Sequence, residues 1–421
     1  MFGFVQNWLA PRANPIGVDF GSDTLRLAQV QLVDNDYHLV AAASADVPSH
    51  VRQDPVARLT FFTETIRDLL SQGDFRGRSA ILALPSSSMF VQHLRLPKMT
   101  EEALRKALPW EARGKLPIDP SQALLRHMVA GDIFQDQEVR SEVIVMAASR
   151  ELVNQLLGAA SKGKLDVVGM NVEPKAIVDC FQHVYRRKSD ADVTNLFVDI
   201  GAVGTRAIIA RGGRVLFART IPMGGDYLNE DVARAMHVTT DEARLTRIKL
   251  CSQQPALDET RQKQQLCSPA PTTDEDTEDH TTIDAASMSG ASGTVGLAGA
   301  LSPVDRRIDL ALAFEQASML AADKLVDELN LCRRYHEATF PATPVDRLVF
   351  VGGESKQRGL CQHIAQGLGL AAQLGDPLVR MGRVSMIGIE SGIDRRLPQP
   401  NWAVAIGLSM GPKVEATTEV R

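Results

Sequence analysis

The sequence predicts an α/β protein of two lobes, with a smaller α+β subdomain inserted into the first lobe. Three observations predict this fold class: one strand-turn-strand motif occurs twice, strand and helix patterns follow each copy, and a segment of different character separates the copies. The chain of 421 residues is long enough for about two to four units with hydrophobic cores of their own.

The internal repeat forms the predicted cores of the two lobes. The first copy reads IGVDFGSDTLRLAQVQL from Ile16, and the second reads NLFVDIGAVGTRAIIARGG from Asn195. In each copy an apolar strand ends in Val-Asp-apolar-Gly, a tight turn follows, and two further strands complete an antiparallel meander. Helical patterns, VARLTFFTETIRDLL and YLNEDVARAM, come after the meanders. The repeat therefore predicts a pseudo-two-fold arrangement with a cleft between the lobes, where ligands usually bind.

The segment between the copies predicts the inserted subdomain. It offers two strands, FVQHLRLP and EVIVMAAS, and two helices, within MTEEALRKALPWEARGKLP and SRELVNQLLGAASKG. We expect the following division of the chain: first lobe core at 15–85 and 166–194, inserted subdomain at 86–165, second lobe core at 195–222 and 345–411, and outer subdomain of the second lobe at 223–251 and 304–344.

Residues 252–303 are expected to be disordered, because they lack periodicity, are rich in Ser, Thr, Asp, Gly and Ala, and cannot bury enough apolar surface to offset their ordering entropy. The termini, 1–14 and 412–421, are expected to be flexible.

Charge and composition argue against several classes of protein. The net charge is −5 and no long Lys/Arg tract occurs, which argues against nucleic-acid binding. The five cysteines form no Cys-x-x-Cys pair and the nine histidines no H-E-x-x-H motif, so no zinc site is indicated. No apolar run reaches the ~18–20 residues that span a bilayer, and the first residues do not resemble a signal peptide. We therefore expect a cytoplasmic protein.

The turns after Asp19 and Asp199 carry the candidate chemistry. Small residues there allow backbone N–H groups to cradle phosphate oxygens, and an aspartate at a strand end can hold a hydrated Mg²⁺ through water. One such turn is more often only a hairpin. This sequence has two copies, followed by the strand and Gly-Gly turn LVFVGG at 348–353, and such a combination is much less probable by chance.

Two other glycine-rich segments resemble nucleotide-binding motifs but are rejected. Residues Gly158–Lys164 resemble a Walker A loop and Gly367–Ala372 a dinucleotide-binding fingerprint, but both come at the end of a helix pattern and not between a strand and a helix.

These motifs, in this order, resemble the actin-like ATPase superfamily that includes FtsA, MreB, the DnaK-type chaperones and sugar kinases. Within it the chain resembles the PilM family of type IV pilus assembly. The segments that carry this closer resemblance include LPSSSMFVQHLRLPKMTEEALRKALPWEARGKLPID, VVGMNVEPKAI, PMGGDYLNEDVA and NWAVAIGLSMG. The resemblance extends from Pro15 to Met410, apart from the low-complexity segment. It implies a two-lobed actin-like ATPase fold, in which each lobe contains one copy of a ribonuclease H-like core.

The resemblance also implies ATP or ADP with Mg²⁺ between the lobes. Glu173 would occupy the place where relatives position the hydrolytic water, and Asp19 and Asp199 would hold Mg²⁺ through water. The nucleotide-binding residues that it implies are Asp19, Gly21, Ser22, Asp23, Thr24 and Arg26 in the first loop, Asp199, Gly201, Ala202, Val203, Gly204 and Thr205 in the second, and Gly225, Arg244, Arg247, Gly352, Gly353, Glu354 and Ser355 around the nucleoside.

Two departures from the family pattern favour binding over turnover. Arg26 stands where a lysine is usual, and the two cations are not equivalent toward phosphate. Arg244 replaces a glutamate expected to accept a hydrogen bond from ribose. The chain would then be at most a slow ATPase. Alternatives that stay open are a pseudo-ATPase interaction module, an FtsA-like cell-division scaffold and a small-molecule kinase on the same fold.

The resemblance finally implies a partner. PilM relatives hold the N-terminal cytoplasmic tail of the inner-membrane protein PilN in a groove between the first lobe and the inserted subdomain. We therefore expect a scaffold within the pilus assembly machinery that is recruited to the inner face of the membrane through this partner. An extended peptide in such a groove would be recognised by main-chain hydrogen bonds and by pockets for alternate side chains.

Overall fold

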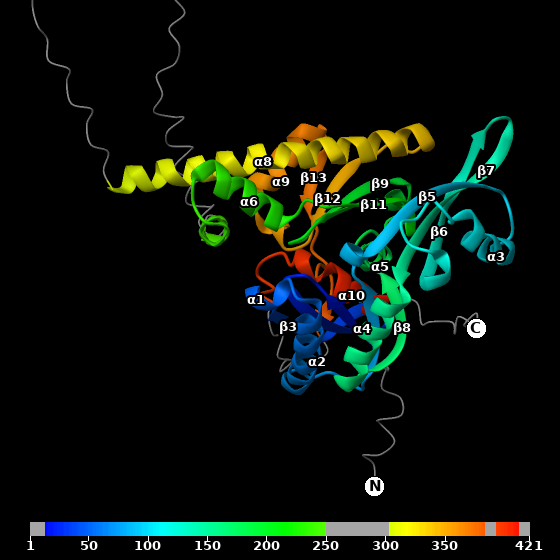
Figure 1. Cartoon of the computed structure of the whole chain (residues 1–421), viewed down its shortest axis with the longest axis horizontal. Helices are drawn as coiled ribbons and strands as arrows, with labels where there is room; N and C mark the ends of the chain where they lie inside the picture. Colours follow the sequence, from blue (N-terminus) through cyan, green and yellow to red (C-terminus); the bar gives the residue numbers. More distant parts are fainter. Residues whose placement is uncertain (1–12, 250–302, 384–392, 412–421) are drawn as a thin grey trace, which may run out of the picture.

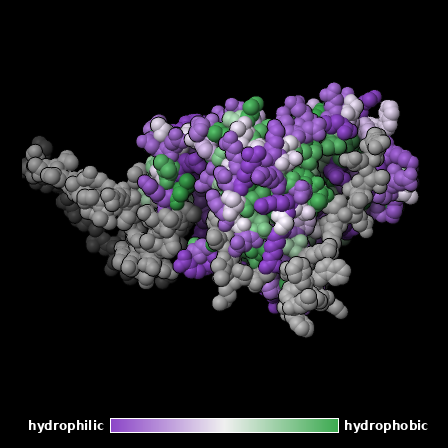
Figure 2. Space-filling view, turned by 90° about the horizontal axis from the view of Figure 1, so that it is seen from below, coloured by the Kyte–Doolittle hydropathy of each residue, from purple (hydrophilic) through white to green (hydrophobic). Residues whose placement is uncertain are grey.

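The structure is a computed structural model that describes residues 13–249, 303–383 and 393–411. Two lobes lie one above the other in Figure 1, with the inserted subdomain at one side of both. Viewed from below, polar residues cover most of the described surface, and apolar residues show in patches between them (Figure 2). The segments 252–303 and 412–421, predicted to be disordered or flexible, lie outside the described residues except for residue 303.

The first lobe contains a six-stranded sheet in the order β14-β3-β2-β1-β4-β8. Its strands are β1 (Ile16–Phe20), β2 (Thr24–Val33), β3 (Asp36–Asp46), β4 (Ser79–Leu84), β8 (Asp166–Val172) and β14 (Gly382–Arg383). Helices α1 (Ser49–Arg52), α2 (Pro55–Gln72) and α5 (Glu173–Gln182) belong to the same lobe. Phe62, Ile66 and Leu69 of α2 are buried in the main core with residues of β1, because their spacing places them on one face of the helix.

The second lobe contains a five-stranded sheet in the order β11-β10-β9-β12-β13. The strands are β9 (Thr194–Ile200), β10 (Thr205–Arg211), β11 (Arg214–Ile221), β12 (Arg347–Val351) and β13 (Ala371–Leu374). Helices α6 (Gly225–Met236), α8 (Pro303–Thr339) and α9 (Arg358–Leu368) cover it, and residues 240–249 are also helical. The long helix α8 crosses the whole upper lobe in Figure 1.

The predicted duplication is confirmed in the strand pairing. In the first copy β1 pairs antiparallel with β2, with Val18 opposite Leu27, and parallel with β4. In the second copy β9 pairs antiparallel with β10, with Val198 opposite Ala207, and parallel with β12. The central strand of each lobe therefore ends at the edge where its parallel neighbour also ends, which brings the loops of one lobe together.

The inserted subdomain is built from a three-stranded antiparallel sheet in the order β5-β7-β6 and one helix. Its elements are β5 (Met89–Pro97), α3 (Glu101–Glu111), β6 (Ala123–Gln135) and β7 (Glu138–Ser149). One face of the sheet packs on α3 through Leu94, Leu96, Leu104 and Val143. Strand β6 was not predicted, because its half-exposed sequence ALLRHMVAGDIFQ shows no clean alternation.

Two boundaries differ from the sequence prediction. Helix α4 (Arg150–Lys162), expected in the inserted subdomain, packs against α2 and β8 of the first lobe. Helix α10 (Ala403–Met410), expected in the second lobe, packs on α5, β1 and β2.

Asn14, which the sequence prediction placed in the flexible N-terminus, is hydrogen-bonded to α10 and to β2. Its side chain donates a hydrogen bond to Ser409 O at 2.8 Å, and its backbone N–H donates to Val30 O at 2.9 Å.

Among the described residues, no helix is long and apolar enough to cross a membrane.

Candidate functional site

The ends of the two central strands place two buried aspartates at the junction of the lobes. Asp19 lies at the end of β1 and Asp199 at the end of β9, and their exposed fractions are 5% and 2%. Tight loops follow both. In the second loop Gly201 N–H donates to Gly204 O at 3.0 Å, and in the first a Cβ on Gly21 would overlap Thr24 O. Both loops therefore depend on small residues.

An arginine stands beside each aspartate. Arg26 of β2 is directly opposite Asp19 in the strand register, and Arg206 of β10 is directly opposite Asp199. Each arginine follows its aspartate by seven residues in the sequence. Arg206 was not among the predicted site residues, although this shared spacing within the repeat would have indicated it.

Arg206 connects the second loop to Glu173. Its Nε donates to Asp199 Oδ2 at 2.6 Å, and its Nη1 donates to Glu173 Oε2 at 3.1 Å. The same Glu173 oxygen accepts from the backbone N–H of Ser86 at 2.9 Å. Glu173 is 3% exposed at the first position of α5. Two carboxylates hold the pKa of Arg206 above its usual value although burial opposes this, so the trio is a buried charged cluster.

The corresponding pair in the first lobe is less complete. Arg26 Nη1 lies 3.8 Å from Asp19 Oδ2, and Arg26 Nε is buried without a hydrogen-bond partner among the described residues. Burial raises the pKa of Asp19 to about 7; Arg26 opposes this rise and Glu173 adds to it. Burial likewise lowers the pKa of Arg26. An orphaned guanidinium N–H beside a carboxyl group favours an anionic acceptor at this position.

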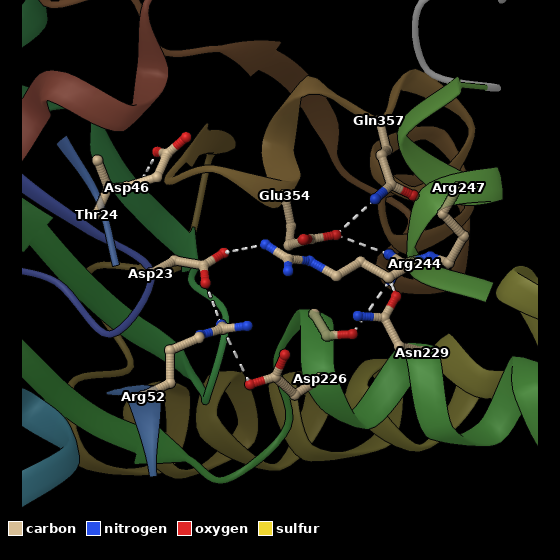
Figure 3. A network of polar contacts seen from close by, with 11 residues as sticks. Asp23, Thr24, Asp46, Arg52, Asp226, Asn229, Arg244, Arg247, Glu354 and Gln357 are labelled. Atoms are coloured by element: carbon tan, nitrogen blue, oxygen red, sulfur yellow. Dashed lines mark hydrogen bonds and ion pairs between the residues drawn. The ribbon is translucent and has the colours of Figure 1, made fainter. Parts of the chain in front are cut away.

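Ion pairs cross from one lobe to the other at the first loop (Figure 3). Asp23 of this loop pairs with Arg52 of α1, and Arg52 lies 3.5 Å from Asp226 at the start of α6 in the second lobe. Arg244 of the second lobe lies 3.6 Å from Asp23. Asp23 and Arg52 thus meet one charged residue each from the opposite lobe.

A second network orders the start of α6. Arg247, 3% exposed, donates to Gly225 O at 3.1 Å and to Glu354 Oε2 at 2.7 Å, and it also contacts Asn229. Gly225 N–H donates to Gly201 O at 2.9 Å, which ties the helix to the second loop. A Cβ on Gly225 would overlap the carboxylate of Glu354. Arg247 therefore has a structural role, because it connects its own helix at 240–249 to α6 and to the turn after β12.

The Gly-Gly turn after β12 completes the site. Gly352 has φ of +88°, and a Cβ there would overlap Asp199 Oδ1 and Ile200 O. Only glycine fits such a position without strain. Gly353 has open space around its Cα. Ser355 is buried and its hydroxyl donates to Val351 O, so this side chain points away from the loops.

The structure brings several of the predicted residues together at the junction of the lobes. They come from segments far apart in the sequence and include Asp19, Asp23, Arg26, Glu173, Asp199, Arg244 and Gly352. The hydroxyls of Thr205 and Ser355 instead donate to the backbone carbonyls of Met223 and Val351, and buried Arg247 is bonded within the second lobe. Within the described part of the chain, no three His, Cys, Asp or Glu side chains form a cluster that could hold a metal ion directly. A cation held here would need ligands besides these side chains, such as water or phosphate oxygens.

Two lobes built on one repeated meander, in each of which the central strand ends in an aspartate and pairs with a parallel neighbour, are typical of an actin-like fold. Comparison with known families supports this class and narrows it. The family model "Type IV pilus assembly protein PilM" matches residues 17–256, and the model "Cell division protein FtsA" matches residues 196–407. The chain belongs to the PilM family of type IV pilus assembly proteins.

A solved structure supports this fold. The chain is similar to a structure described as the PilM-PilN type IV pilus biogenesis complex, with a TM-score of 0.68 and 22% identity over 95% of this chain and 98% of that one. It also matches the ethanolamine utilization protein EutJ from Carboxydothermus hydrogenoformans, with a TM-score of 0.47 and 12% identity over 96% and 91% of the two chains. MreB 5 of Spiroplasma citri matches with a TM-score of 0.42 and 12% identity over 94% of each chain.

Proposed function

We propose that this protein binds ATP or ADP with Mg²⁺ between its lobes and acts as a scaffold in type IV pilus assembly by docking the N-terminal tail of a PilN-type inner-membrane protein. The observation that carries the nucleotide assignment is the duplicated aspartate-arginine pair, in which the buried Nε of Arg26 has no hydrogen-bond partner among the described residues. A phosphate oxygen supplies the acceptor that this guanidinium lacks.

The residues present fit a magnesium nucleotide. The backbone N–H groups of the two small-residue loops would hold phosphate oxygens, and Asp19 and Asp199 would hold the hydrated cation through water. Arg244 and the Gly352-Gly353 turn would contact the nucleoside. When bound, Mg²⁺ would offset the charge of the phosphates and of the two buried carboxylates. This would favour the ionised form of Asp19, which burial disfavours by raising its pKa.

The contacts of Glu173 favour binding over turnover. Both Arg206 and the Ser86 N–H are bonded to the same Glu173 oxygen. An oxygen that already accepts two hydrogen bonds is less available to orient an attacking water. The protein is then at most a slow ATPase whose nucleotide stabilises the closed arrangement of the lobes.

The partner assignment rests on family membership and on the inserted subdomain. The related solved structure is described as a PilM-PilN complex. In this chain a peptide tail would lie in a groove between the first lobe and the inserted subdomain, expected at residues 86–165. The protein would remain in the cytoplasm and reach the inner face of the membrane through this partner.

The nucleotide assignment is tested by titrating a fluorescent ATP analogue with Mg²⁺ into wild type, Arg26→Met and the control Arg67→Met. Arg67 is an exposed arginine of α2 that donates to Lys162 O. Loss of a charge-assisted hydrogen bond predicts about a tenfold to hundredfold weaker affinity for Arg26→Met. Equal affinities for all three proteins would contradict the assignment.

The partner assignment is tested by hydrogen exchange on the full chain, with and without a synthetic peptide of the PilN-type N-terminal tail from the same organism. We expect protection in β5 to β7 and in the first-lobe segments beside them. A scrambled peptide is the control. Absence of peptide binding, or protection confined to the second lobe, would reject docking at the inserted subdomain.

A further inference from the structure

A groove of about 970 Å³ lies between the inserted subdomain and the second lobe. The start of β5, the end of β11 and the second half of α8 line it, together with Leu116 and Pro117. It is separate from the junction of Asp19 and Asp199, and none of the predicted nucleotide residues lines it. It also differs from the groove proposed for the PilN-type tail, because its second wall is the second lobe.

Two sheet edges border this groove. Strand β5 is the outer strand of the three-stranded sheet, and β11 is the outer strand of the five-stranded sheet. In the described residues neither pairs with a further strand on its outer side. Edge strands carry outward N–H and C=O groups that readily pair with an added strand.

The outward peptide groups of β11 can be identified from His93. Its Nε2 lies 3.2 Å from Ala218 O, so this carbonyl points away from β10 and toward the inserted subdomain. Because a residue's N–H and C=O point to the same side of a strand and alternate along it, Thr220 also presents its peptide groups outward. Ala218 and Thr220 both line the groove.

His93 is held firmly in this position. Its Nδ1 lies 3.0 Å from Glu142 Oε1, and its ring stacks on Phe217 with centroids 4.8 Å apart. Tyr335 of α8 donates its hydroxyl proton to the same Glu142 oxygen at 2.7 Å. Glu142 is fully buried. The three walls of the groove are thereby joined by one buried carboxylate, so the groove is largely formed before any ligand binds.

The side chains of the groove define the chemistry of an occupant. Phe90 and Leu331, 41% and 46% exposed, give it an apolar surface, whereas Arg219 and Arg334 add positive charge. No aspartate or glutamate is among the residues that line it. Glu328 of α8 lies 2.7 Å from Arg219 and offsets its charge, whereas Arg334 is exposed. Arg334 therefore favours an acidic ligand.

We propose that this groove is a second peptide-docking site, which takes an extended segment of a protein partner with apolar residues at alternate positions and at least one carboxylate. The segment adds to the edge of β11 as an additional strand. Its backbone bonds to Thr220, its apolar side chains contact Phe90 and Leu331, and its carboxylate meets Arg334. The same protein can then hold this segment and the PilN-type tail at once.

A phage-displayed library of random twelve-residue peptides, selected on the full-length protein, tests the proposal. Enriched peptides are synthesised with a fluorophore, and their affinities are measured for wild type, Thr220→Pro and Arg334→Glu. Proline removes the outward N–H, and proline at an outward position of an edge strand is tolerated by the sheet. We expect a loss of affinity of at least tenfold for both variants, together with a preference for acidic, alternating sequences.

Matched variants separate these effects from unfolding. Thr220→Val keeps the N–H and the branched shape, and Arg234→Glu makes the same charge change at an exposed position of α6 outside the groove. Both should bind as wild type does, and urea unfolding should show all four variants to be folded. Selected peptides that bind all variants equally would overturn the proposal. So would a failure to enrich any peptide, or displacement of the selected peptides by the PilN-type tail.

Discussion

At the scale of single residues, Arg206 holds two buried carboxylates that would otherwise repel each other. It bonds to Asp199 and Glu173, which are 2% and 3% exposed. Removing one partner of a buried charged group leaves the others uncompensated, and such changes cost about 3–5 kcal/mol. We expect Arg206→Met to lower the free energy of unfolding by about this amount in urea titrations without nucleotide. Arg234→Met, at an exposed arginine, is the control, and an equal effect of both would contradict this role.

A second prediction at this scale concerns pH. Burial raises the pKa of Glu142, but hydrogen bonds from His93 and Tyr335 hold it below its usual value of 4.5. Since the unfolded chain then binds this proton first as the pH falls, the stability that Glu142 contributes is complete above about pH 4.5 and is lost below it. Glu142→Gln should lower stability at neutral pH and flatten the dependence of stability on pH below about pH 4.5. Parallel curves for the two proteins would contradict the prediction.

At the scale of elements, the Gly-Gly turn after β12 offers a paired test. Gly352 has a φ of +88° and no room for a Cβ, whereas Gly353 has open space. Gly352→Ala should therefore destabilise the protein by about 1–3 kcal/mol and weaken nucleotide binding, because the added methyl group displaces Asp199. Gly353→Ala should leave both quantities nearly unchanged. Thermal unfolding and nucleotide titration measure both, and similar behaviour of the two variants would show that the turn is not constrained in this way.

Some elements and site residues of this protein could be predicted from the sequence, and others could not. The meanders and the loops after Asp19 and Asp199 were predictable, because periodicity and turn residues are local signals. The membership of α4 and α10 was not, because an amphipathic or wholly apolar helix does not specify which lobe it packs on. Arg206 was missed, although its seven-residue spacing from Asp199 repeats that of Arg26 from Asp19. Arg52 had no sequence signal, since only the folded chain brings it to Asp23.

At the scale of the whole molecule, ion pairs connect the two lobes beside the junction of Asp19 and Asp199. Arg52 connects Asp23 of the first lobe with Asp226 of the second, and Arg244 of the second lobe reaches Asp23. We expect Arg52→Met to increase hydrogen exchange in the facing segments around residues 21–24 and 224–227 while the sheets stay protected. Added Mg²⁺ and ATP should reverse much of this increase. Unchanged exchange in these segments would mean that the pairs do not hold the lobes closed.

The measurement that tests the account most directly is calorimetric titration of ATP with Mg²⁺ into wild type, Asp19→Asn and the control Asp34→Asn, with phosphate release followed in parallel. Asp34 lies in the turn between β2 and β3 with φ of +49°, which asparagine also tolerates. The account predicts binding by wild type and control, loss of binding in Asp19→Asn, and little phosphate release. Binding that survives Asp19→Asn unchanged, or no binding by wild type, would contradict a nucleotide site between the lobes.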